Sequence, residues 1–220
     1  MKDDNMRLSL LEFSGSLDEG TEFIPLMSSE DEAKMHKEEI PDELPILPVR
    51  NTVLFPGVVI PITVGRDKSI NLVKEAYKGS KIIGVVAQKN QMVEEPGVED
   101  MYEVGTVARI LRMLKMPDGS STIIIQGTRR MKVKEYVQVD PYFKAKVVAY
   151  DNAESKSKPK HFKALVSSIK DLALQIINES PNIPTEASIA IKNIDSPSFL
   201  INFISSNMQS PAKDKQDLLE

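Results

Sequence analysis

Residues 104–126, with the sequence VGTVARILRMLKMPDGSSTIIIQ, contain the signal that decides the fold class. The side chains from Val104 to Met116 follow the period of two that is typical of a β-strand. Asp118-Gly119, which comes next, is the strongest hairpin signal in the chain, because both residues tolerate the backbone of a tight turn. The apolar residues of Thr122–Gln126 then predict the returning strand, so this stretch predicts a long antiparallel hairpin.

Further strands are predicted on both sides of this hairpin. They cover residues 44–49, 58–64, 81–88, 131–139 and 142–150. Pro61 cannot donate a hydrogen bond to a neighbouring strand, so the second of these is expected at a sheet edge or a bulge. A single early helix is predicted over residues 68–78. At least six strands with one helix favour an antiparallel barrel or sandwich-like core.

The pattern changes after residue 160. Apolar residues recur with a period of 3.6 and predict one face of an amphipathic helix; they are Phe162, Leu165, Val166, Ile169, Leu172, Ala173, Ile176 and Ile177. Ser196-Pro197 and Ser210-Pro211 each predict a helix start, with Ser as the N-cap and Pro at the first helical position. The last third should therefore be an α-helical bundle, and the class α+β.

The predicted domain organisation has four parts. Residues 1–43 should form an acidic, mostly disordered leader, because residues 1–40 hold 11 acidic and four basic residues with no sustained periodicity. Residues 44–150 should form the β domain, 151–160 a linker and 161–220 the helical bundle. The helix that begins near Pro211 has no stop signal before Glu220, so we expect the bundle to be truncated at its last helix.

Composition excludes several function classes. The chain has no Cys, which rules out disulfides, thiolate metal sites and a Cys nucleophile. Its formal net charge of -4 provides no basic field for nucleic acid or anionic membranes. No segment has the pattern of a signal peptide or a membrane-spanning helix, so a cytoplasmic protein is expected.

No catalytic, cofactor-binding or metal-binding constellation is recognisable. A phosphate-binding loop is missing, and His36 and His161 lack ligand spacing. The three Ser-x-x-Lys matches fall in the linker, at a helix start and on a polar helix face, where a buried, deprotonated Lys is not expected. The sequence therefore predicts a binding module.

Two apolar features are candidate substrate-binding surfaces: residues 53–59, where apolar side chains continue through a turn, and the tip of the long hairpin. The candidate residues are Phe55, Pro56, Val58, Met113, Leu114 and Met116. Flexible Met side chains suit apolar recognition of varied partners. The alternative is that both features cover the ends of the barrel or pack on the helices.

A basic group on the same hairpin and its continuation suggests an RNA-binding alternative. Its members are Arg109, Arg112, Lys115, Arg129, Arg130, Lys132 and Lys134. No aromatic side chains lie among them to stack on bases, and a strand face whose charge is offset by nearby acids explains them equally well.

Several linked motifs resemble the N-terminal domain of bacterial Lon proteases. The resemblance begins at Leu44–Gly57 (LPILPVRNTVLFPG) and continues through Ile60-Pro61, Val64–Arg66, Val86–Lys89, Tyr102–Ala108, Leu114–Gly119 and Gln126–Arg130. It covers residues 44 to about 150 in order, and then more loosely the helices. It implies a PUA-like pseudo-barrel followed by a helical bundle.

The resemblance also implies a function. The parent would be a hexameric, ATP-dependent serine protease that degrades damaged and regulatory proteins. Its ATP- and Mg-binding loop and its Ser–Lys dyad would lie beyond Glu220, so this part would carry no catalytic site and no cofactor. The expected role is substrate recognition and assembly, with unfolded or degron-bearing proteins and other copies of the chain as partners. The alternative is a stand-alone PUA-like adaptor or RNA-binding module.

Overall fold

The computed structural model describes residues 32, 34–35, 37–116, 120–150, 159–180, 183 and 186–220. The fold is mixed α and β, as predicted. The described strands are β1 (Glu43–Val49), β2 (Val59–Val64), β3 (Ile82–Ala87), β4 (Val104–Lys115), β5 (Ser121–Gln138) and β6 (Lys144–Tyr150). The described helices are α3 (Asp67–Lys78), α4 (Pro159–Glu179), α5 (Glu186–Asn193), α6 (Pro197–Asn207) and α7 (Ala212–Leu219), with a short 3-10 helix, η1 (Val98–Asp100).

The six strands form one sheet that closes on itself. Their order is β2-β5-β4-β3-β1-β6, and β6 also pairs with β5. The predicted long hairpin is confirmed, because β4 pairs antiparallel with β5 from Val104↔Lys132 to Lys115↔Ser121. Asp118-Gly119, the predicted turn, lies outside the described residues. β2 lies at the end of the order, which agrees with the edge position predicted from Pro61.

Two details of the predicted strands are wrong. The sheet is not fully antiparallel, because β1 and β3 pair in parallel. The connection between them includes β2 and α3, which is long enough for the crossover that parallel strands need. The two strands predicted over 122–126 and 131–139 are one continuous strand, β5. Register shifts opposite Val107/Ala108 and Ile110/Arg112 bend its pairing with β4 without ending it.

The core joins the sheet to the C-terminal helices. One cluster of buried side chains includes Leu47, Phe55 and Ile125 from the sheet region together with Phe199 and Leu200 from α6. A second cluster, around Ile46, Val86 and Met131, belongs to the sheet region and its connections. The sheet and the helices α6 and α7 are therefore packed as one body in this structure.

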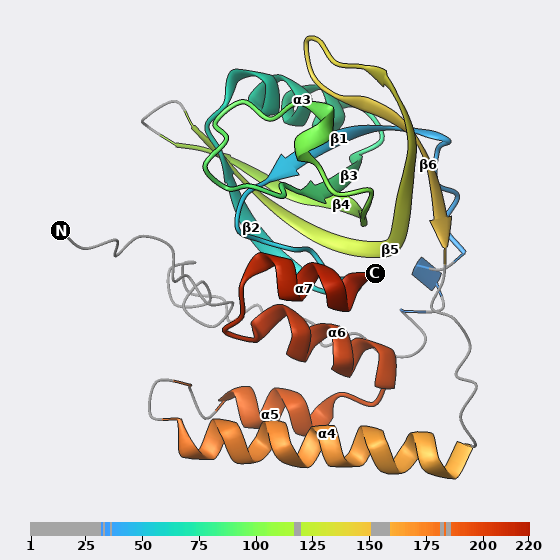
Figure 1. The fold of residues 1–220 in the computed structure, drawn as a ribbon, viewed down its shortest axis with the longest axis vertical. Coiled ribbons are helices and arrows are strands. Elements are labelled where there is room, and N and C mark those ends of the chain that lie inside the picture. The colour runs from blue at the N-terminus through green and yellow to red at the C-terminus, as the bar shows by residue number, and fades with distance from the viewer. Residues whose placement is uncertain are drawn as a thin grey trace, which may run out of the picture.

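Helices α4 to α7 lie in successive layers on one side of the sheet, with α7 nearest to it, followed by α6, α5 and α4 (Figure 1). Ser196 caps α6 as predicted, since its Oγ accepts from the Phe199 N–H at 3.1 Å and Pro197 is the first helical residue. The start of α7 differs from the prediction: Pro211 is its N-cap, and no side-chain bond caps it.

α4 covers the predicted amphipathic segment, but its apolar residues are not all on one packed face. Val166, Ala173 and Ile177 pack against the core. Four others that the sequence pattern assigned to the same face are exposed, namely Leu165, Ile169, Leu172 and Ile176. No described helix of the chain is both long and apolar enough to cross a membrane.

Parts of the predicted leader contact the folded region. The Glu38 carboxylate pairs with Arg109 at 2.6 Å, and Glu32 accepts a hydrogen bond from Ser196 Oγ. Residues 1–31, which contain most of the predicted leader, lie outside the described residues, as do residues 151–158 of the predicted linker.

Candidate functional site

The end of the β4–β5 hairpin exposes a group of apolar side chains. Leu111, Leu114 and Met116 are 40%, 41% and 44% exposed, and Met113 is half-buried. The hairpin projects at the margin of the sheet (Figure 1). Leu114 and Met116 are thus exposed at the end of the hairpin, whereas Met113 packs partly against the core on the other face of the strand. We name Met113, Leu114 and Met116 the hairpin patch.

The hairpin patch is held by three paired strands. Lys115 pairs with Ser121 across the hairpin, and Ser121 pairs with Val64 of β2 on its other side. The Thr63 and Thr122 hydroxyls add a hydrogen bond of 3.1 Å between β2 and β5. A three-stranded ladder limits bending of the hairpin, while the exposed Met116 side chain keeps its rotamer freedom. The arrangement can bind apolar groups of varied shape.

The other candidate segment is mostly internal. Phe55 is 1% exposed and Val58 is 2% exposed, so neither forms the predicted recognition surface, and the alternative of internal packing describes them. Pro56 is half-buried, and its carbonyl accepts from Asn202 Nδ2 at 3.1 Å. Apolar residues continue through this turn because it packs between the sheet and α6.

Two glycines make this internal turn possible. Gly57 has a φ of 82°, which is readily available only to glycine. Gly57 N–H donates to Gly127 O at 2.8 Å, and Gly127 N–H donates to Val58 O at 2.9 Å. A Cβ on Gly127 would lie 2.4 Å from the Phe55 carbonyl oxygen, so only glycine allows this approach.

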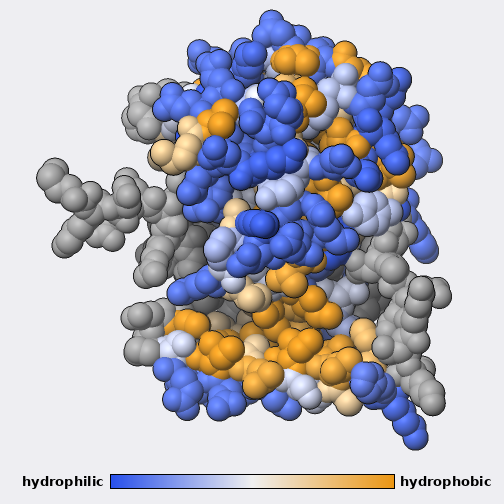
Figure 2. All heavy atoms as spheres, viewed as in Figure 1, coloured by the Kyte–Doolittle hydropathy of each residue, from blue (hydrophilic) through white to orange (hydrophobic). Residues whose placement is uncertain are grey.

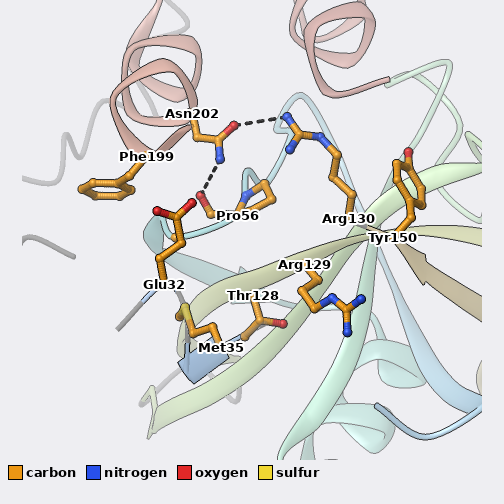
Figure 3. A pocket seen from close by; sticks show the side chains of 10 residues that line it. Glu32, Met35, Pro56, Thr128, Arg129, Arg130, Tyr150, Phe199 and Asn202 are labelled. Carbon is orange, nitrogen blue, oxygen red and sulfur yellow. Dashed lines mark hydrogen bonds between the residues drawn. The ribbon is translucent and has the colours of Figure 1, made fainter. Parts of the chain in front are cut away.

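Arg130 joins the sheet to the helices. Its Nη2 donates to Asn202 Oδ1 at 3.2 Å, and its Nε donates to Leu219 O at 2.8 Å. Gln216 Nε2 of α7 also donates to Val104 O of β4, at 3.0 Å. Figure 3 shows Asn202 between Pro56 and the Arg130 guanidinium. We name this set of bonds the sheet–helix joint.

Burial at the joint lowers the pKa of Arg130 from its ordinary value. An Arg side chain stays charged at neutral pH after such a change, so its charge-assisted bonds remain. A hollow beside it, lined by Arg129, Tyr150 and Phe199 among others (Figure 3), has a volume of about 20 Å³. This is room for about one water molecule, so the hollow does not fit a peptide side chain.

The basic group predicted as an RNA-binding alternative is divided by the structure. Arg130 belongs to the joint, Arg109 pairs with Glu38, and Lys132 pairs with Glu103 at 3.1 Å. Nearby acids thus offset part of the strand face, and a nucleic-acid surface is not favoured. No local pattern predicts the joint, because Arg130 and Asn202 are 72 residues apart in the chain.

The described residues thus form a closed sheet with exposed apolar side chains at the end of its long hairpin. Comparison with known proteins gives the family of the chain. Residues 43–220 match the family model described as "ATP-dependent protease La (LON) substrate-binding domain". The chain belongs to this family.

Relatives and solved structures agree with this assignment. The chain is 55% identical over 212 residues to Lon protease of Flavobacterium johnsoniae, covering 96% of the chain and 26% of that protein. It is 56% identical over 202 residues to Lon protease of Cytophaga hutchinsonii, covering 92% of the chain and 25% of that protein. The N-terminal domain of Mycobacterium avium complex Lon protease has the same fold, with a TM-score of 0.64 at 20% identity over 80% of this chain and 89% of that one. The chain thus spans about a quarter of the length of the curated relatives it matches.

Proposed function

We propose that the chain recognises substrates for a longer, ATP-dependent serine protease of the Lon family that degrades misfolded and regulatory proteins in the cytoplasm. The family match over residues 43–220 and the relatives named Lon protease support this proposal. The ATP and Mg site and the Ser–Lys dyad would lie in the part of such a protein that the chain does not cover. In this proposal, the role of the described residues is binding and positioning.

The proposed substrate site is the hairpin patch, formed by Met113, Leu114 and Met116. The exposed side chains of Leu114 and Met116 at the end of a ladder of three strands are the observation that supports it best. Apolar segments of an unfolded chain would gain about 25 cal/mol per Å² buried there, without a requirement for a particular sequence. In a hexamer, several patches on one assembly would increase the apparent affinity through effective concentration.

The domain organisation is part of the proposal. We assign residues 44–150 to a PUA-like pseudo-barrel and 161–220 to a helical bundle that leads toward the rest of the protein, with 151–160 as the linker and 1–43 as the leader. Closure of the sheet through the β5–β6 pairing supports the first assignment. The layered helices support the second (Figure 1).

The test is a titration of a fluorescent, permanently unfolded protein with three forms of the chain. The Met113→Ser, Leu114→Ser, Met116→Ser triple variant should bind about tenfold more weakly than the unmodified chain, a loss of about 1.4 kcal/mol. Val148→Ser is the control, because Val148 is 50% exposed on β6 and lies outside the patch. Equal affinity of the triple variant and the control would contradict the assignment of the patch.

A further inference from the structure

α4 has a second apolar face that nothing in the described structure covers. Leu165 is 47% exposed, Ile169 37%, Leu172 58% and Ile176 60%. At 100° per residue, these four side chains are centred about 90° around the helix from the packed residues Val166, Ala173 and Ile177. Figure 2 shows the apolar surface gathered over the helical layers on this side of the molecule. We name the four exposed residues the α4 stripe.

The spacing within the α4 stripe is that of a coiled-coil seam. The residues follow one another at intervals of four, three and four. Ile169 and Ile176 thus occupy a positions and Leu165 and Leu172 occupy d positions, with the half-buried Phe162 at the preceding a position. A stripe restricted to a and d is narrower than a core-facing stripe and is typical of a helix pair. Ile at a with Leu at d favours two parallel strands.

The residues beside the stripe suit a second copy of the same helix. The e positions are Val166 and Ala173, and the g positions are Ser168 and Gln175, so none of the four is charged. Two identical helices would therefore meet without like-charge repulsion. Lys170, at a b position, is turned toward α5, where it donates to Lys192 O at 2.9 Å and to Ile194 O at 3.1 Å.

We propose that the α4 stripe is the interface between two copies of this chain, paired as a short, parallel, two-stranded coiled coil. One surface patch is then used by both partners around a two-fold axis. The stripe spans 12 residues, or about 18 Å, and is one helix wide. Such a contact is far below the roughly 800 Å² per partner of a standard interface, so the pair is weak on its own. It would act where several copies are already held together.

The absence of Cys in the chain allows a direct test by paramagnetic relaxation. A nitroxide is attached to Gln175→Cys in one sample and mixed with an isotope-labelled, unmodified chain. At about 0.5 mM, amide signals from the C-terminal half of α4 in the isotope-labelled copy should broaden, and dilution of about tenfold should remove the effect, as expected for a weak pair. A nitroxide on Val148→Cys should cause no broadening in α4.

Two variants distinguish pairing through the α4 stripe from nonspecific hydrophobic association. Leu172→Ser should reduce the intermolecular broadening at least fivefold, whereas Leu218→Ser should leave it unchanged, because Leu218 is 49% exposed but lies on α7. Both residues are exposed, so both variants should fold.

Other occupants of the stripe would give different results, each of which overturns the proposal. If deletion of residues 1–31 exposed the stripe, and if this effect did not depend on protein concentration, the N-terminal part of the same chain would be what covers the stripe. Broadening confined to the N-terminal half of α4 would contradict the parallel pair. If an unfolded protein, added in a separate titration, bound the stripe while the two copies showed no intermolecular broadening, the stripe would be a substrate surface instead. The assay contains no substrate, so its failure would leave the proposed function to its own titration.

Discussion

The sheet and helix α4 differ in how far they bury their apolar side chains. In β1, Leu44, Ile46, Leu47 and Val49 are all 5% exposed or less. In α4, none of the residues from 160 to 179 is fully buried, although the apolar spacing of the helix is regular. The closed sheet covers Leu44 and Ile46 on one face of β1, and α3 packs on the other face, where Leu47 and Val49 lie. A helix in an outer layer buries only the face that meets its neighbours, so the rest of its apolar arc is left for other contacts.

The largest effect is expected when one apolar side chain in each region is shortened to Ala. Phe55→Ala should lower the free energy of unfolding by about 3–5 kcal/mol, because it removes a fully buried ring and leaves a cavity. Leu172→Ala should change it by about 0.5 kcal/mol or less, because that side chain is mostly in solvent. Urea denaturation at a protein concentration too low for pairing measures both. Similar losses for the two variants would mean that α4 is packed more closely than the structure indicates.

A second variant tests the connection between the two regions. Arg130→Met removes the donors to Asn202 Oδ1 and Leu219 O and leaves a buried acceptor without its partner. The expected loss of stability is about 1.5–3 kcal/mol. Hydrogen exchange should become faster in α6 and α7 while the strands keep their protection. Lys134→Met, on an exposed part of β5, is the control, and equally faster exchange in the strands would argue against a local joint.

The smallest expected effect concerns a buried hydroxyl group in the sheet region. The Tyr136 hydroxyl is buried, and no described residue accepts or donates a hydrogen bond there. Burial raises the pKa of Tyr136 to about 12. Because the unfolded value is near 10, the folded state holds this proton more tightly, so stability is complete below about pH 10 and falls as the pH rises toward 12.

Tyr136→Phe should remove the unpaired hydroxyl and keep the edge-to-face contact with Phe143, at 5.6 Å between centroids. We expect a gain of up to about 1 kcal/mol at pH 7. The decrease in the free energy of unfolding above pH 10 should become smaller but remain, since the pKa of Tyr142 is also raised to about 12, chiefly by burial. Unfolding free energies at pH 7 and pH 11 provide the measurement, and an unchanged pH dependence would contradict the assignment to Tyr136.

Local signals predicted the elements better than their partners. Period-two alternation located the strands, and Ser196-Pro197 located the start of α6, because these depend on neighbouring residues. The direction of β1 relative to β3 was wrong, since alternation is the same in parallel and antiparallel strands. The continuous β5 was missed because bulges absorb the irregular residues around Gly127.

The candidate site was predictable only in part. The hairpin patch followed from Met and Leu side chains beside a turn signal. The burial of Phe55 and Val58 depends on α6, which begins about 140 residues later, so no local pattern distinguishes an exposed apolar turn from one that is covered. The same limit applies to α4, whose apolar residues share one period but lie partly in the core and partly on the surface.

The closure of the sheet has a consequence for synthesis on the ribosome. β1 pairs with β3, and its other edge pairs with β6, where Leu44 lies opposite Ala145. Residues about 100 positions apart must both be available before the ring of strands is complete. At roughly 5–20 residues per second, the first strand waits at least 5–20 s for its last partner to be made. During that interval an apolar edge strand is open, which makes early cover by chaperones or by the strands already synthesised most valuable for this chain.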